Sequence, residues 1–148
     1  KAWITLADFY YLRHNHSKAL KYIQKVLTFE PNEPYYWRRY AELNYFEFQN
    51  LEEAEYGYRK AVQNGDYSYN TLIEWVDLMF LTQKYGDALP IVADIVHIYP
   101  HELNNYFRLS LAYYGVGDEH TALQYYQMGV TKAPEWQSFF ENKFNFKM

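Results

Sequence analysis

A repeat period of about 34 residues constrains this chain more than any other feature of its sequence. Stretches of equal length that open with Ala-Leu and close with Pro occur at Ala19–Pro31, Ala88–Pro100 and Ala122–Pro134. Ala54 belongs to the same series, which is evenly spaced apart from one extra residue before Ala54. A fixed period of this length indicates that each unit is one supersecondary element and that neighbouring units stack to bury a continuous core.

Apolar residues within a unit recur three and four positions apart, which is the spacing of an amphipathic helix. In the first unit, one such face carries Trp3, Leu6, Ala7 and Tyr10, and a second carries Leu20, Ile23, Val26 and Leu27. A polar turn lies between them at residues 14–17, with counterparts at 49–50, 83–84 and 117–118. Each unit is therefore predicted to be a helix, a short turn and a helix. The alanines mark the places where the two helices approach closely.

The second unit departs from the period. It has one extra residue between Ala41 and Ala54, which we place near residues 46–48, and it lacks the closing proline. Proline closes the other units because it cannot continue a helix. Pro90 lies inside the third unit. We expect it in the first turn of a helix that begins at Gly86-Asp87, where backbone N–H groups have no intrahelical partner.

The pattern resembles the tetratricopeptide repeat family. The first unit matches the family's signature places through Trp3, Leu6, Ala7, Tyr10, Ala19, Ile23, Val26 and Pro31, and the fourth matches them through Tyr106, Leu109, Ser110, Tyr113, Ala122, Tyr126, Gly129 and Pro134. The resemblance implies an all-α, right-handed solenoid of antiparallel helix–turn–helix repeats, at about residues 1–33, 34–68, 69–102 and 103–134, in a single domain. For residues 135–148 we favour a capping helix over the start of a fifth repeat.

In this family the first helices of the repeats line a concave inner surface. Carried over to this chain, that implies three rows of groove residues: Ile4, Arg38, Ile73 and Phe107; then Asp8, Glu42, Asp77 and Leu111; then Tyr11, Tyr45, Phe80 and Tyr114. The rows share a face because they are three and four positions apart within a helix. The second row is acidic in three units and the third is aromatic in all four. We expect these side chains to lie off the packing face, although packing against the neighbouring unit is the competing interpretation for Tyr45 and Phe80.

The resemblance implies a non-catalytic scaffold that binds a peptide or protein segment. The expected partner segment carries basic residues beside apolar or aromatic ones. Family members that hold chaperone tails clamp the terminal carboxylate with Lys, Arg and Asn. The corresponding places here are Ile4, Asp8, Arg39, Asn70 and Glu74, of which only Arg39 is cationic. This clamp is therefore absent. The alternative function is an oligomerisation or spacer module, in which exposed aromatic residues pair with another copy or another domain.

Composition narrows the function classes further. The net charge is −4 and no basic run stands out, which argues against binding nucleic acid or an anionic membrane surface. Without cysteine there is no disulfide framework, thiolate metal site or cysteine nucleophile. No apolar run approaches the ~20 residues of a membrane span. The five histidines lack metal-site spacing. We expect no enzyme activity, catalytic residue, metal or cofactor.

The chain begins at Lys1, already inside a patterned segment, so we expect it to be a piece of a longer protein. Its compartment is left open, with the cytoplasm favoured. The sequence identifies neither the partner, nor the oligomeric state, nor the parent protein's function.

Overall fold

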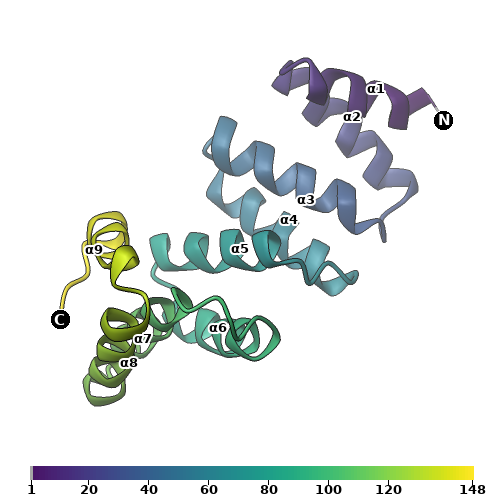
Figure 1. Ribbon diagram of the computed structural model, residues 1–148. Coiled ribbons are helices and arrows are strands. Elements are labelled where there is room, and N and C mark those ends of the chain that lie inside the picture. The colour runs from purple at the N-terminus through teal and green to yellow at the C-terminus, as the bar shows by residue number, and fades with distance from the viewer. Residues whose placement is uncertain (1) are drawn as a thin grey trace. The chain divides into compact units, whose positions relative to one another are not determined.

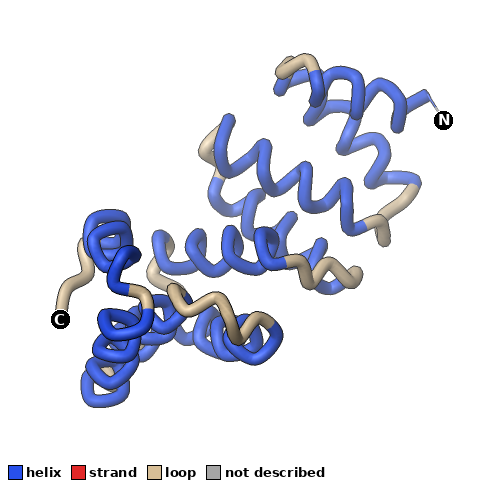
Figure 2. Tube along the Cα trace, viewed as in Figure 1, coloured by secondary structure: helices blue, strands red, loops and turns tan. Residues whose placement is uncertain are grey.

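The computed structural model describes residues 2–148, which form helices joined by short loops without any strand (Figures 1 and 2). The chain divides into two compact units, Lys1–Thr71 and Leu72–Met148. The first unit holds α1 (Ala2–Leu12), α2 (His16–Phe29), α3 (Pro34–Glu42), a π-helical segment (Leu43–Glu47) and α4 (Leu51–Gln63). Helix α5 (Tyr69–Leu81) begins at the end of the first unit and runs into the second. The second continues with α6 (Tyr85–Ile98), α7 (Asn105–Gly115), α8 (Glu119–Lys132), a 3-10 turn (Pro134–Trp136) and α9 (Gln137–Phe144).

The predicted two helices per repeat are confirmed (Figure 1). Side-chain caps start several of them. Asn15 accepts a hydrogen bond from the Lys18 backbone N–H, and Asp118 accepts one from the Thr121 backbone N–H. Each cap thereby gives a partner to an N–H group that has none within its own helix. Because proline cannot continue a helix, α2 and α6 end before the prolines that close their repeats.

The alanine series marks the tight helix contacts. Ala19, Ala54, Ala88 and Ala122 are each 0% exposed, two in the first unit and two in the second. The prediction that these are close-approach sites is confirmed. Each alanine also donates its backbone N–H to the residue four positions earlier, at the end of the preceding turn. The same residue thus lies in the first turn of the second helix of a repeat and is buried against the first.

The extra residue of the second repeat is absorbed by the π-helical segment that follows α3. There Phe48 donates its N–H to the Leu43 carbonyl, 3.1 Å away and five positions earlier, which is the π-helical pattern. The turn then closes with Asn50 donating to Asn44, six positions back, whereas Asn15 in the first repeat reaches only five positions back, to Tyr10. The π segment therefore restores the register, and Ala54 packs like the other alanines.

The turn between paired helices shares one backbone feature in all four repeats. One residue in each has a left-handed backbone: His14 (φ 57°), Gln49 (φ 52°), Gln83 (φ 60°) and Gly117 (φ 90°). Each of them stands five positions before the alanine of its repeat, so the turn recurs with the same period as the alanines. Only the fourth repeat places glycine, the residue that adopts this conformation without steric cost, at this position.

Pro90 is not in the first turn of its helix, contrary to the expectation. Helix α6 begins at Tyr85, so Pro90 is its sixth residue and leaves the Gly86 carbonyl without its intrahelical donor. The helix nevertheless continues to Ile98. Both Gly86 and Pro90 are exposed, so solvent can satisfy that carbonyl.

Two glycines provide a matched test of helix packing. A Cβ added at Gly57 would lie 2.9 Å from the Ala41 Cβ and 3.0 Å from the Ala41 backbone, which cannot yield without moving α3. A Cβ added at Gly86 would meet nothing nearer than 3.9 Å. We expect Gly57→Ala to destabilise the chain by about 1–3 kcal/mol. We expect Gly86→Ala to stabilise it by about 0.5–1 kcal/mol, because alanine is the better helix former. Urea unfolding followed by circular dichroism measures both, and equal effects would contradict the α3–α4 packing.

Candidate functional site

In the first unit, α1 and α3 bring together a polar cluster of Tyr11, Arg38, Arg39 and Glu42. The Tyr11 hydroxyl donates to Glu42 Oε2 (3.2 Å), and Arg39 Nη1 donates to both Glu42 Oε2 (2.8 Å) and the Tyr11 oxygen (3.1 Å). Arg38 Nε donates to the other carboxylate oxygen of Glu42 (2.7 Å). Glu42 is only 8% exposed, whereas the other three side chains are half-buried. The buried Glu42 carboxylate therefore fixes the cluster, while the other three side chains remain partly accessible to a ligand.

The aromatic members of this cluster are held in fixed positions. The Arg39 guanidinium carbon lies 4.6 Å from the ring centre of Tyr11 and 4.9 Å from that of Tyr35, which is cation–π geometry on both sides. Burial, together with the neighbouring Glu42 carboxylate, raises the pKa of the Tyr11 hydroxyl. That hydroxyl therefore stays protonated at neutral pH and keeps donating to Glu42.

The remaining predicted residues of the first unit lie beside the cluster. Ile4, Asp8 and Tyr45 are half-buried, and the Tyr45 ring stacks on Phe46 at 4.5 Å. Burial and, second, the Asp8 carboxylate raise the pKa of Tyr36 to about 12. All six groove residues predicted for this unit thus keep an accessible or only just buried side chain.

A cavity of about 220 Å³ adjoins the cluster. Its lining joins the end of α1, the following turn and the π-helical segment, through Tyr11, His14, His16, Glu42, Leu43, Phe46 and Glu47. His16 Nε2 lies 3.4 Å from a carboxylate oxygen of Glu47. The one-residue insertion of the second repeat therefore shapes a wall of this cavity.

In the second unit, Asp77 forms a buried ion pair that the sequence analysis missed. Its two carboxylate oxygens accept hydrogen bonds from Arg108 Nε (2.8 Å) and Nη2 (2.9 Å), and Lys143 Nζ lies 3.2 Å from Oδ2. Asp77 and Arg108 are 4% and 3% exposed. Asp77 therefore does not face a partner as a free acid in this structure. Glu42 is likewise neutralised within the chain, and Asp8 alone among the acidic row is half-buried rather than buried.

Three predicted groove residues of the second unit lie in its interior. Phe80, Phe107 and Leu111 are 3%, 0% and 5% exposed, so the expectation that they lie off the packing face is wrong. Ile73 is half-buried and Tyr114 is 47% exposed. Aromatic residues need partners for their large apolar rings, and here the end of the chain supplies them.

The segment that begins at Gln137 covers this face of the second unit. Its rings pair with the predicted groove rings: Phe140 with Phe107 (centroids 5.4 Å apart), Phe144 with Phe80 (5.6 Å) and Phe146 with Tyr114 (5.4 Å). Helix α9 is also shorter than α7, with 8 residues against 11. Its placement suits a capping helix, and whether it caps the array or begins a fifth repeat stays a prediction.

The sequence did carry a signal for Arg108. A further row, one position beyond the first groove row, contains Thr5, Arg39, Glu74 and Arg108 at the repeat spacing. Arg39 and Arg108 are thus equivalent residues, and both bind an acid of the second groove row. Which acid each arginine meets differs, because Arg39 pairs with Glu42 three positions along its own helix while Arg108 reaches Asp77 on another helix.

Among residues 2–148, no three His, Cys, Asp or Glu side chains are grouped so that they could hold a metal ion. Within the same range, no helix is both long and apolar enough to cross a membrane. The polar clusters in both units pair acids with arginines instead, and such pairing holds side chains in place.

Comparison with known proteins supports the repeat architecture. The tetratricopeptide repeat family model matches residues 1–43. No curated protein sequence matches the chain. Among solved structures, MamA (residues 41 to the end) from Desulfovibrio magneticus RS-1 is 17% identical with a TM-score of 0.75, and the match covers 97% of this chain and 84% of MamA.

Two further structures have the same fold. YrrB, a tetratricopeptide repeat protein with an unusual peptide-binding site, is 16% identical with a TM-score of 0.79, over 95% of this chain and 72% of YrrB. The Naa15/Naa10 complex bound to HypK contains a chain that is 18% identical with a TM-score of 0.70, over 84% of this chain and 19% of that one. The repeat period and the helix–turn–helix fold agree with the match of residues 1–43 to the tetratricopeptide repeat model, and the solved structures share this fold.

Proposed function

We propose that the chain is a non-catalytic scaffold that binds a segment of a partner protein on the inner faces of its first-of-pair helices. The observation that carries the proposal is the fixed, accessible cluster of Tyr11, Arg38, Arg39 and Glu42 on α1 and α3. Hydrogen bonds and ring contacts hold these side chains before any ligand arrives, so binding costs little further ordering. YrrB, which has this fold, is a protein with a peptide-binding site.

The chemistry of the cluster suits a segment that mixes aromatic and charged residues. Tyr11 and Tyr35 offer ring faces, and Tyr35 is 45% exposed. Asp8 attracts a lysine or arginine of the ligand, while Arg38, which shares its carboxylate partner with Arg39, provides a donor for a ligand carboxylate. Aromatic contact area supplies most of the affinity, and the charges supply register and association rate.

A peptide-array screen on the full chain, followed by variants on the best hit, tests this proposal. We expect Tyr11→Ala to weaken binding about tenfold or more, mainly through a faster off-rate, because it removes contact area. We expect Asp8→Lys to slow association and reduce its salt dependence. Surface plasmon resonance at two salt concentrations measures both effects.

Tyr56→Ala is the matched control, since Tyr56 is a 41% exposed tyrosine on α4, a second-of-pair helix. Its affinity should change less than about twofold. A peptide that binds equally well to the Tyr11, Asp8 and Tyr56 variants uses another surface, and the proposed site would then be abandoned.

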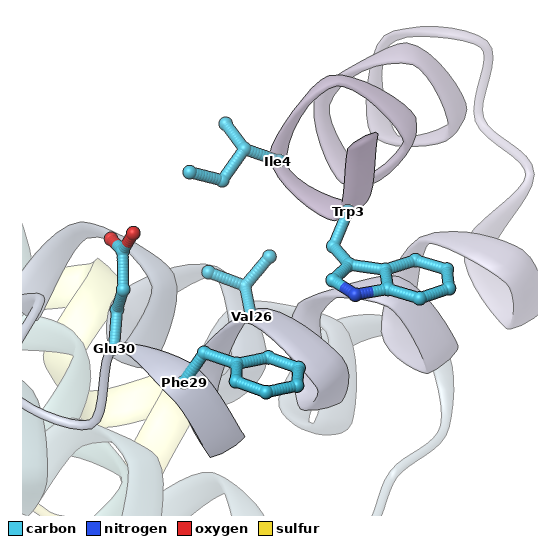
Figure 3. A pocket seen from close by; sticks show the side chains of 5 residues that line it. All are labelled: Trp3, Ile4, Val26, Phe29 and Glu30. Carbon is cyan, nitrogen blue, oxygen red and sulfur yellow. The ribbon is translucent and has the colours of Figure 1, made fainter. Parts of the chain in front are cut away.

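Self-association is the second candidate function, and one cavity favours it. Trp3 and Ile4 of α1 face Val26, Phe29 and Glu30 across a cavity of about 200 Å³ (Figure 3). Phe29 is 71% exposed at its rim. An apolar cavity with an exposed ring beside it can receive a ring from a second copy. Light scattering decides the matter, because a monomer at every concentration would exclude this function.

A further inference from the structure

The residues predicted to bind a partner in the second unit already bind a segment of the chain itself. The C-terminal segment, residues 137–148, contacts four of the six: Lys143 bonds Asp77, Phe140 stacks on Phe107, Phe144 packs on Phe80, and Phe146 packs on Tyr114. Three of these contacts are aromatic and one is ionic. This is the chemistry that the groove rows predicted for a partner.

We propose that the C-terminal segment is an intramolecular ligand of the rest of the second unit, residues 72–136, and that a partner helix of the same chemistry displaces it. That partner carries a lysine or arginine at the place of Lys143, with aromatic residues on either side at the places of Phe140 and Phe144. The proposal rests on the proposed function, since it assumes that the inner faces bind partner segments, and it adds the ligand class and an autoinhibitory contact for the second unit.

The contact between Asp77 and Lys143 favours a segment with a positive charge at this place. Asp77 holds two cations, but they differ in burial, since the side chain of Arg108 is 4% exposed and that of Lys143 is 34% exposed. Arg108 is bound through two hydrogen bonds and lies on α7, outside the C-terminal segment. Lys143 sits at the solvent edge, so a partner lysine or arginine can replace it without disturbing the buried pair.

Helix α9 is held in place by its contacts with the rest of the second unit. Helix α9 has 8 residues, and isolated helices shorter than about 12 residues are marginal in water, so it depends on its contacts with the unit. Asn145 ends it with a left-handed backbone (φ 49°). At its other end, the short turn Pro134–Trp136 leads into it, and Gln137 Nε2 donates to the Tyr126 hydroxyl of α8 (3.0 Å).

The packing of Phe140 determines how strongly the C-terminal segment is bound to the rest of the second unit. Phe140 is 1% exposed and contacts both the Phe107 ring and the Arg108 guanidinium, whose carbon is 4.8 Å from its centre. A partner must therefore refill this place rather than enter an empty groove. Its apparent affinity is reduced by the fraction of molecules in which the segment remains bound.

The test measures binding of a fluorescein-labelled peptide with the sequence of residues 137–148 to the full chain by fluorescence anisotropy. The opened variant carries Lys143→Glu and Phe144→Ala, which remove two edge contacts and keep Phe140. Lys147→Glu is the control, because it makes the same charge change at an exposed lysine in the same segment. We expect the opened variant to bind the peptide about tenfold more tightly than the wild-type chain, and the control to match the wild type.

Amide hydrogen exchange distinguishes a displaceable segment from a fixed cap, because the peptide should not change the exchange rates of a fixed cap. Saturating peptide should speed amide exchange at residues 138–146 of the wild-type chain, since the displaced helix has no stabilising contacts. If the double variant unfolds, Lys143→Glu alone keeps the aromatic contacts and should bind about threefold more tightly than wild type.

Equal affinity of the folded opened variant and the wild type, with unchanged exchange, would overturn the proposal and leave α9 as a fixed cap. Failure of the peptide to bind a folded opened variant would overturn it as well. Neither result touches the cluster of the first unit, whose array hits and Tyr11 and Asp8 variants test the proposed function separately.

Discussion

Arg108→Ala is expected to destabilise the second unit by about 3–5 kcal/mol, because it leaves the Asp77 carboxylate buried without its main partner. Asp77 is 4% exposed, and Lys143 at its edge satisfies only one of its oxygens. The loss also removes the guanidinium that lies over the Phe140 ring. Urea unfolding followed by circular dichroism measures the change.

Two further variants make this result specific. Arg59→Ala, at an exposed arginine, should stay within about 0.5 kcal/mol of the wild type. Replacing the pair together, with Asp77→Leu and Arg108→Met, should restore much of the stability, because an apolar pair of similar volume avoids the cost of burying charge. An Arg108→Ala variant no less stable than Arg59→Ala would show that the ion pair contributes nothing.

Phe140→Ala is expected to cost about 3–5 kcal/mol, as large-to-small changes of fully buried aromatic residues do. The neighbouring Phe139→Ala should cost about 1 kcal/mol or less, because Phe139 is 42% exposed. Both rings touch Trp136, so the comparison measures what Phe140 adds through its buried contacts, which include Phe107 and Arg108. Thermal melting distinguishes the two variants, and similar losses would contradict the prediction that α9 acts as a cap.

The fold was predictable because the same helix–turn–helix pattern recurs four times in the sequence. The alanine series indicated which helices touch, and the extra residue between Ala41 and Ala54 announced an insertion. The period did not reveal how the chain would absorb that residue. A π-helical segment and a shifted turn do so, since both keep the hydrogen bonds that a looped-out residue would break.

The candidate site was less predictable, because side-chain pairing across helices leaves little trace in spacing. The rows did not show that Glu42 and Asp77 are neutralised by arginines. Reversing the charge of Asp77 is therefore expected to destabilise the second unit. Its charge is part of the core of the second unit, and only Asp8 keeps the exposure that such a change requires.

The C-terminal segment was the hardest part to place, because it lies outside the period. Trp136, Phe139, Phe140 and Phe144 recur at helical spacing, which predicts a helix. In a fifth repeat, Phe144 would place a large ring where the other repeats have a small residue, which favours a cap. Nothing in the spacing showed that its rings would pack on Phe80 and Tyr114. Those contacts depend on which rings lie opposite one another in the folded chain, and the sequence spacing does not give this.

The most direct test of the central claim is a nuclear magnetic resonance titration of the ¹⁵N-labelled chain with the best peptide from the array. Binding on the inner faces predicts the largest amide shifts around Tyr11 and Arg39 on α1 and α3, or around Phe80 and Tyr114 together with the C-terminal segment. Shifts confined to the second-of-pair helices α2, α4, α6 and α8 would contradict the account.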